Sequence, residues 1–202
     1  MIGIAAAAAF FACVAFLGVQ VSRYVCAGVE PAEDGPRPGR APNIALVIGA
    51  GLVGGVLMAA GALPLQLGIG AITIFALVAC WCSDAACGLV PDLFTLGPLA
   101  ALLLFAVAQH DWMTVGSAVV IFIPFAIAAI ISRGRGMGWG DVKLVALTGA
   151  VLGAPLALMA LAAACIAAAI GHRIWGAKHS PIAFAPYIAA VTGLALPLGL
   201  GH

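Results

Sequence analysis

Charged residues are scarce in this 202-residue chain. Only 7% of the residues are Asp, Glu, Lys or Arg, divided between seven acidic and eight basic side chains. Soluble domains carry roughly 25% charged residues, so this composition excludes an ordinary water-soluble fold. The net charge is +1 and no basic run occurs, which argues against a nucleic-acid partner. The few acidic residues are therefore the first places to look for chemistry.

Common metal-site motifs are also missing. The chain has no Cys-x-x-Cys pair and no His-Glu-x-x-His arrangement, which argues against the zinc sites that use them. Cys80, Cys82 and Cys87 follow no common zinc spacing, so we interpret them as small hydrophobic side chains, with a metal site as the alternative. No serine is paired with a histidine in a suggestive way. We therefore expect neither a metal nor a cofactor, and the sequence disfavours serine and metal-dependent mechanisms.

Long apolar runs take the place of the missing charge, because 65% of the residues are hydrophobic. Runs near or above 18 apolar residues are candidate transmembrane helices. The pattern predicts an all-α, polytopic membrane protein with about eight spans, at residues 2–22, 43–62, 66–83, 93–109, 113–132, 141–153, 155–172 and 182–200. The sixth span is short, and a single long kinked segment is the alternative to separate sixth and seventh spans.

The first span has the flanks of a retained helix. No basic region precedes it, and Arg23 follows it. This arrangement favours a span with its N-terminus outside over a cleaved signal peptide. Residues 27–42 come next and are rich in Pro, Gly and charge, so we expect them to form a loop between the first two spans.

The basic residues give the spans an orientation. When the eight spans are threaded alternately from an outside N-terminus, every Lys and Arg falls on the odd-numbered connections: Arg23, Arg37, Arg40, Arg133, Arg135, Lys143, Arg173 and Lys178. Cytoplasmic loops carry an excess of Lys and Arg, so these connections are predicted to face the cytoplasm. The same threading places Asp84 and Asp141 at the cytoplasmic face.

Asp84 ends the third span, and the loop predicted from residue 83 to 95 follows it. An ionisable group at the edge of the bilayer core is costly and is a functional-site hypothesis by default. An aspartate at a helix C-terminus also opposes the macrodipole, although a solvated loop residue is the structural alternative. Asp92 follows Pro91 at the start of the next span. We interpret it as a cap of that helix, with a catalytic role as the alternative.

The second loop, residues 133–143, is rich in glycine and contains Gly138-Trp139-Gly140-Asp141. Glycines at 138 and 140 allow a peptide to approach closely, and Trp139 between them is a candidate substrate contact. A phosphate cradle is the alternative, but the charge of Asp141 would repel an anion. Lys143 is interpreted as a snorkelling anchor that could also bias Asp141 toward ionisation.

Together these motifs resemble one family. Asp84 with Pro91-Asp92, and Gly138-x-Gly140-Asp141-x-Lys143, are similar to the motifs of type IV prepilin peptidases, which are membrane aspartic proteases of the GxGD kind. Residues 180–189, Ser-Pro-Ile-Ala-Phe-Ala-Pro-Tyr-Ile-Ala, resemble the closing segment of that family, with Ala185 in place of the usual glycine. The resemblance implies a six-helix peptidase core at 66–202, preceded by two further helices in 1–65.

The resemblance carries functional expectations. It implies that Asp84 and Asp141 are the catalytic pair, one acting as general base and the other as general acid, and that Gly138 and Gly140 shape the second loop. The implied substrate is a prepilin or pseudopilin, cleaved at the cytoplasmic face of the bacterial inner membrane. Membrane lipid and a pilus or type II secretion assembly machinery are the implied partners.

One part of the family pattern is missing. Longer members insert a domain with two Cys-x-x-Cys pairs where this chain has only the 27–42 loop. The resemblance therefore implies the peptidase activity and leaves N-methylation open.

Two other classes compete with a peptidase. A small transporter or channel would use carboxylates near the middle of its spans, on helices repeated between two halves. Here both aspartates fall at one face and no repeat is visible. A purely structural assembly subunit would have dispensable aspartates.

Overall fold

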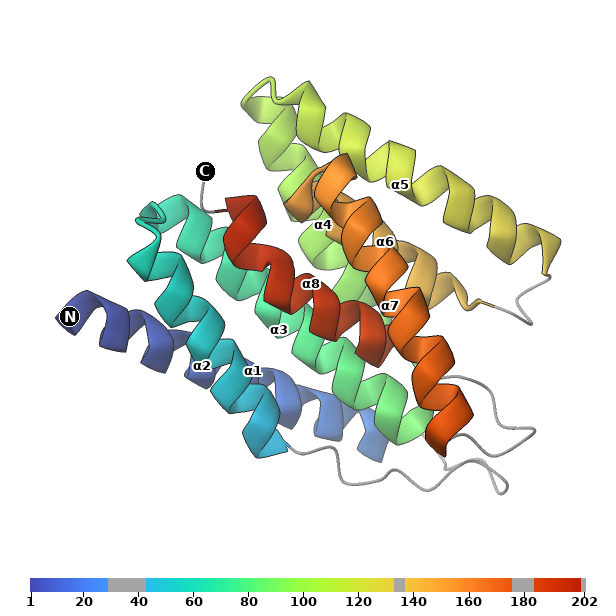
Figure 1. Ribbon diagram of the computed structural model, residues 1–202, viewed down its shortest axis with the longest axis horizontal. Coiled ribbons are helices and arrows are strands. Elements are labelled where there is room, and N and C mark those ends of the chain that lie inside the picture. Colours follow the sequence, from blue (N-terminus) through green and yellow to red (C-terminus); the bar gives the residue numbers. More distant parts are fainter. Residues whose placement is uncertain (29–42, 133–136, 176–183, 201–202) are drawn as a thin grey trace.

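A computed structural model describes residues 1–28, 43–132, 137–175 and 184–200. This part of the chain is all-helical, which confirms the predicted fold class. Its eight helices follow the predicted order (Figure 1): α1 (Ile2–Ala27), α2 (Asn43–Ala59), α3 (Pro64–Cys87), α4 (Asp92–Ala108), α5 (Trp112–Ile131), α6 (Trp139–Leu152), α7 (Ala154–Trp175) and α8 (Ala185–Leu200).

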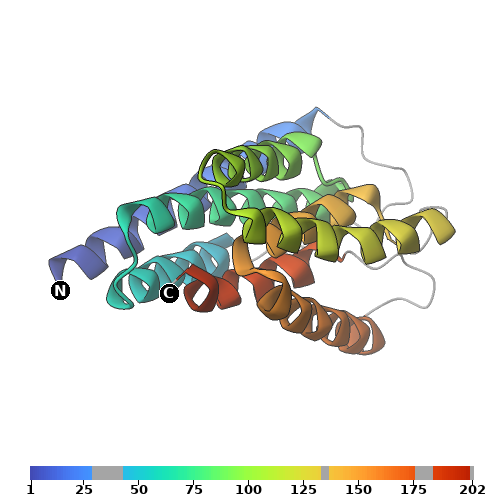
Figure 2. The ribbon, with the colours of Figure 1, turned by 90° about the horizontal axis from the view of Figure 1, so that it is seen from above.

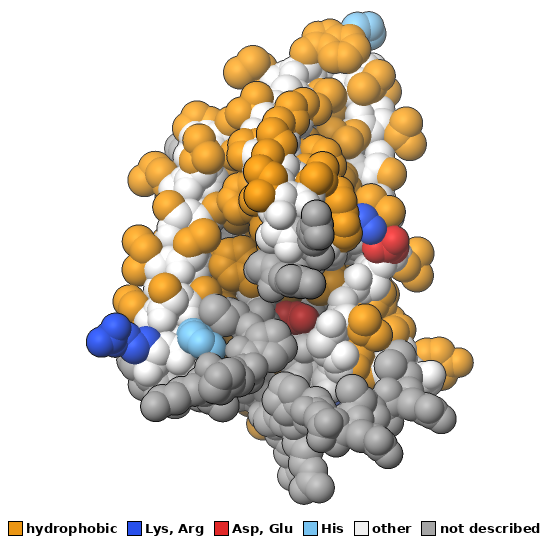
Figure 3. All heavy atoms as spheres, turned by 90° about the vertical axis from the view of Figure 1, so that its right-hand side faces the viewer, with side chains coloured by type: hydrophobic (Ala, Val, Ile, Leu, Met, Phe, Trp, Pro, Cys, Tyr) orange, Lys and Arg blue, Asp and Glu red, His pale blue; other side chains and the backbone are white. Residues whose placement is uncertain are grey.

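The helices carry the surface of a membrane protein. By length and composition, four of them can cross a bilayer: α1, α3, α5 and residues Ala154–Arg173 of α7. Three shorter apolar helices, α2, α4 and α8, accompany them. Hydrophobic side chains cover most of the described surface in Figure 3. Exposed apolar area costs about 25 cal/mol per Å² in water, so lipid is the favourable surrounding. The chain is a multi-pass membrane protein.

The third helix is longer than the sequence predicts. It continues to Cys87 and ends at Gly88, whose φ of +65° is the left-handed conformation that glycine adopts without strain. The Gly88 N–H donates to the Asp84 carbonyl oxygen at 2.9 Å. The loop expected at 83–95 is therefore wrong at both ends, since only residues 88–91 separate α3 from α4. Asp84 lies in the last turn of a helix.

The sixth and seventh spans are separate helices, as predicted. Gly153, with a φ of +74°, interrupts the chain between α6 and α7, and Pro155 lies in the first turn of α7, where proline is tolerated. The two helices run in opposite directions (Figure 1). The single kinked segment is thereby excluded.

Helix α6 forms the centre of the C-terminal part. It packs against α4, α5, α7 and α8, and all its residues from Leu144 to Leu152 are buried. The hydroxyl groups of Thr148 and Thr192 are 3.0 Å apart and join α6 to α8. Because other helices surround it, α6 can be short and still avoid placing backbone ends in lipid.

The first two helices pack against this core. Helix α1 contacts α2 and α3, and Phe11 of α1 is fully buried in the same hydrophobic cluster as residues of α3 and α8. Helix α8 lies between α2 and α7 in two perpendicular views (Figures 1 and 2). The division of the chain at residue 65 stays a prediction.

Successive helices alternate in direction, so the bundle has two distinct ends (Figure 1). One end gathers the last turns of α1, α3 and α7 and the first turns of α6 and α8. The basic residues of the described chain lie in or near these turns: Arg173 in the last turn of α7, Lys143 as the fifth residue of α6, and Arg23 four residues before the end of α1. Other predicted features lie outside the described residues: Arg37, Arg40, Arg133, Arg135, Lys178, most of the 27–42 loop and the start of the 180–189 segment. The side of the membrane that this end faces stays a prediction.

Candidate active site

Asp84 is held in an unusual setting for a carboxylate. It is half-buried in the last turn of α3, and its Oδ2 atom is buried with no hydrogen-bond partner among the described residues. The backbone N–H of Ala185, in the first turn of α8, interacts with the carboxyl group. A buried polar atom without a partner costs about 1–3 kcal/mol, so this oxygen is not explained by stability. An unpartnered buried oxygen of this kind makes Asp84 a candidate functional residue.

Asp141 lies at the N-terminus of a helix, whereas Asp84 lies at a C-terminus. It is the third residue of α6, and its Oδ2 accepts a hydrogen bond from the Gly138 N–H at 3.4 Å. The N-terminus of a helix favours negative charge by about 0.3–1 kcal/mol. Capping of α6 therefore gives Asp141 a structural role as well as a candidate chemical one.

The two aspartates meet at the same end of the bundle. The charge of Asp141 acts on the Asp84 carboxyl group, which places them within electrostatic range. Cys80, buried one turn before Asp84 on α3, interacts with both carboxylates. Two carboxyl groups that repel each other favour a state in which they share one proton. The site can therefore hold an acid and a base together, although its catalytic role stays a prediction.

Gly140 lets the connection before α4 pack against α6. A Cβ atom at residue 140 would lie 2.6 Å from the Cβ atom of Val90, closer than real side chains approach. Gly138 has no such limit, because its added Cβ would meet Asp141 Oδ2 at an ordinary 3.6 Å. Trp139 between them is 49% exposed. The two glycines thus differ: residue 140 is restricted by space, and residue 138 is the N-cap of α6.

Asp92 and Lys143 have partners that the sequence did not reveal. Pro91, not Asp92, is the N-cap of α4, and the Asp92 side chain makes no capping hydrogen bond, so the cap interpretation was wrong. Lys143 Nζ instead donates to Asp92 Oδ1 at 2.5 Å. This ion pair joins α4 to α6 beside the aspartates. Lys143 is not an isolated anchor, and its direct partner is Asp92 rather than Asp141.

Two further contacts were missed by sequence reasoning. The 180–189 segment reaches the site through the backbone of Ala185, which no side-chain pattern announces. The thiols of Cys26 and Cys87 both donate toward the carbonyl oxygen of Ser83, at 3.9 and 3.1 Å. The Cys26 contact links the end of α1 to the end of α3, and the Cys87 contact lies within α3. Within the described ranges, no three His, Cys, Asp or Glu side chains are grouped to hold a metal ion.

Comparison with known proteins agrees with this geometry. The family model described as the type IV leader peptidase family matches residues 70–172, just over half the chain. The matched segment includes Asp84, Asp141 and the helices that carry them. Searches of curated proteins and of solved structures found no match. The chain therefore belongs to the type IV leader peptidase family and is a membrane-embedded peptidase.

Proposed function

We propose that this protein is an aspartic endopeptidase that removes the short basic leader from type IV prepilins or pseudopilins at the cytoplasmic face of the bacterial inner membrane. The observation that carries the proposal is that Asp84 and Asp141 lie within electrostatic range of each other on the contacting helices α3 and α6, at one end of the bundle. Both lie inside the segment that matches the leader peptidase family.

The settings of the two carboxyl groups suggest a division of roles. Burial opposes the charge of both carboxyl groups, but only Asp141 lies at a helix N-terminus, where it accepts a hydrogen bond from the Gly138 N–H. We therefore assign Asp141 as the general base that takes a proton from the attacking water. Asp84 lies at the C-terminal end of α3 with a buried oxygen, which favours its protonated form. Protonated Asp84 donates a hydrogen bond to the scissile carbonyl and then transfers its proton to the leaving amine.

The position of the site fits a substrate that is half in lipid. A prepilin has a basic leader outside the bilayer and an apolar helix within it, so its scissile bond lies at the membrane border. Asp84 and Asp141 occupy terminal turns of apolar helices rather than mid-span positions. A transporter with mid-span carboxylates would not need this placement.

The residues around the dyad are assigned supporting roles. Exposed Trp139 is placed to contact the substrate, and Gly138 and Gly140 shape the start of α6. Pro91 begins α4, and the Asp92–Lys143 pair holds α4 against α6. Membrane lipid and a pilus or secretion assembly machinery are the proposed partners.

Co-expression with a candidate prepilin tests the proposal. Asp84→Asn and Asp141→Asn are each expected to reduce leader removal, read by gel shift, by about 10²–10⁴-fold while the protein still accumulates in membranes. Asp111→Asn is the matched control, because Asp111 caps α5 at the other end of the bundle and Asn is an equally good cap. Normal processing by either dyad variant would overturn the proposal.

A further inference from the structure

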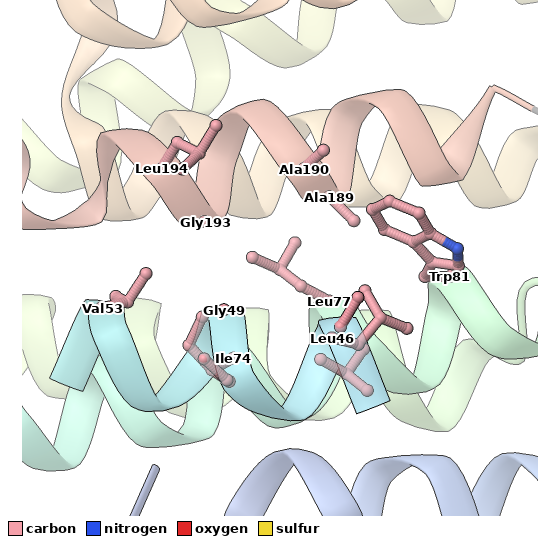
Figure 4. A pocket seen from close by; sticks show the side chains of 13 residues that line it. Leu46, Gly49, Val53, Ile74, Leu77, Trp81, Ala189, Ala190, Gly193 and Leu194 are labelled. Atoms are coloured by element: carbon pink, nitrogen blue, oxygen red, sulfur yellow. The ribbon is translucent and has the colours of Figure 1, made fainter. Parts of the chain in front are cut away.

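An apolar groove lies between α2, α3 and α8 and opens toward the surrounding lipid. Its volume is about 230 Å³. Figure 4 shows Gly49 and Val53 of α2, Leu77 and Trp81 of α3, and Gly193 of α8 around the same space. No charged side chain lines it. The groove can therefore hold only an apolar occupant.

Several residues that line this groove have small side chains or none. A Cβ added at Gly49 would meet nothing within 4 Å, and one at Gly193 would meet only Ile74 Cδ1, at 3.8 Å. Ala189 and Ala190 complete the α8 wall (Figure 4). In membranes, small side chains allow the backbones of two helices to approach closely. The missing side chains leave space that apolar side chains of another helix could fill.

Two walls of the groove point along their helices toward the aspartates, which lie beyond the lining residues. On α8, Gly193, Ala189 and Ala185 follow at intervals of four residues and share one face of the helix. Ala185 is the residue whose N–H interacts with the Asp84 carboxyl group. On α3, Trp81 lies at the end of the groove and Asp84 follows three residues later. Both walls therefore point toward the candidate active site.

We propose that this groove is the docking site for the apolar transmembrane helix of the substrate, and that it presents the scissile bond to Asp84 and Asp141. The inference rests on the proposed function, since it adds the place where that substrate binds. From Gly193 to Ala185 the groove wall spans eight residues, about 12 Å or two helical turns. A helix lying along it reaches the aspartates with its N-terminal end, where a leader would leave the bilayer.

The continuity with the site favours a helix over a lipid chain. A lipid occupant needs no connection to Asp84, whereas a substrate helix must bring one peptide bond to it. Trp81 stands where the groove ends (Figure 4). Asp84 follows Trp81 by three residues on α3, so the end of a helix docked in the groove would lie beside the candidate active site.

Filling the groove tests the inference. Gly49→Leu and Gly193→Leu add a side chain at the groove wall, and the added Cβ atom itself comes no closer than 3.8 Å to a neighbouring atom. Gly97→Leu and Gly116→Leu are matched controls, because an added Cβ there also meets nothing within 4 Å and neither residue lines the groove. Each full-length variant is reconstituted in phosphatidylethanolamine and phosphatidylglycerol vesicles. It is given either a full-length prepilin or a peptide cut after the first turn of the apolar helix.

The expected result is a change in substrate preference. In the groove variants, kcat/KM for the full-length prepilin falls by about tenfold relative to that for the truncated peptide, mainly through KM. The control variants keep the wild-type ratio. An unchanged ratio in both groove variants overturns the inference. If the wild-type protein cleaves neither substrate, the proposed function itself fails, so the two failures are distinguishable.

Photo-crosslinking identifies the occupant directly. A benzophenone side chain at Ala190, in the Asp84→Asn background, is expected to form an adduct with the apolar helix of the prepilin. The same group at Gly97 is expected to form none. The inference is contradicted if position 190 forms an adduct only with lipid, or only with a second copy of this chain, and added prepilin does not displace that adduct.

Discussion

Asp84 and Asp111 belong to opposite ends of the bundle and show two ways of placing an aspartate at a helix terminus. Asp111 is exposed, and its carboxylate accepts hydrogen bonds from the Met113 and Thr114 N–H groups and from the Thr114 hydroxyl at 2.6 Å. These bonds, the one from the Thr114 side chain above all, lower the pKa of Asp111. Asp84 is half-buried and keeps one oxygen without a partner among the described residues.

The difference separates a structural carboxylate from a candidate catalytic one. Every feature of Asp111 stabilises the folded protein, because a satisfied cap contributes about 0.5–2 kcal/mol. The setting of Asp84 lowers the stability of the fold, since a buried acceptor oxygen has no hydrogen-bond donor among the described residues. Such a cost persists where a function requires it. An aspartate thus stabilises the fold at one end of the bundle and destabilises it at the other, and substitutions at each position can test this difference.

The largest expected effect is the loss of activity when the two aspartates are changed. Asp84→Asn and Asp141→Asn should each lower kcat by about 10²–10⁴-fold. The double variant should be no worse than the more damaged single one, because groups that act as a unit are not additive. Single-turnover cleavage of a prepilin measures this. Losses that multiply in the double variant would mean that the two carboxyl groups act separately.

Gly140→Ala should cause the next largest effect. Its Cβ would lie 2.6 Å from Val90 Cβ, and overpacking of this kind costs typically about 1–3 kcal/mol. The start of α6, and Asp141 with it, would shift, so we expect at least about tenfold lower activity. Gly138→Ala is the control, since its Cβ makes an ordinary contact at 3.6 Å. Val90→Gly should partly restore Gly140→Ala, and equal damage by both alanine variants would refute the steric explanation.

Asp111→Ala should affect stability alone. Loss of the cap is expected to lower the free energy of unfolding by about 1 kcal/mol and to leave cleavage unchanged. Because the pKa of Asp111 is lowered in the folded state from its usual 3.8, its charge stabilises the fold above that pH. This contribution is lost as the pH falls through the folded-state pKa. Thermal unfolding in detergent should show the wild-type advantage shrinking below about pH 4, and a constant advantage would contradict the assignment.

The smallest effect is expected at the Asp92–Lys143 pair. Its side chains are 64% and 22% exposed, and exposed ion pairs contribute about 0–1 kcal/mol. Lys143→Met should therefore change activity less than about threefold. It should also leave the pH profile of kcat unmoved, because Lys143 pairs with Asp92 and not with Asp141. A clear shift of that profile would restore Lys143 as a residue that tunes the base.

Much of the fold followed from composition and local pattern. Long apolar runs can satisfy their backbone groups in lipid only as helices, so the helix order and the break at Gly153 were predictable. The exact ends of the helices were less predictable. Gly88 ends α3 four residues beyond Asp84, and the capping bond depends on a backbone angle that the residue type permits but does not require.

The candidate site divides in the same way. Asp84 and Asp141 were found from the sequence, because an acidic residue beside an apolar run is costly and rare. For Lys143 the sequence pointed to an influence on Asp141, the nearest charge along the chain, whereas the structure adds an ion pair with Asp92, 51 residues away in sequence. The role of Ala185 was invisible, because its contribution is a backbone N–H that every residue except proline carries.

The sequence by itself determined that the chain lies in a membrane, that it is helical, and which two acidic residues are the candidates for the chemistry, because hydropathy and the cost of a buried charge are local properties. Only the tertiary structure decided that α3, α6 and α8 meet at one end, that Val90 requires a glycine at 140, and that a groove of small residues points toward Asp84. These features depend on the packing of segments far apart in the chain, where shape and distance, not residue type, determine what touches.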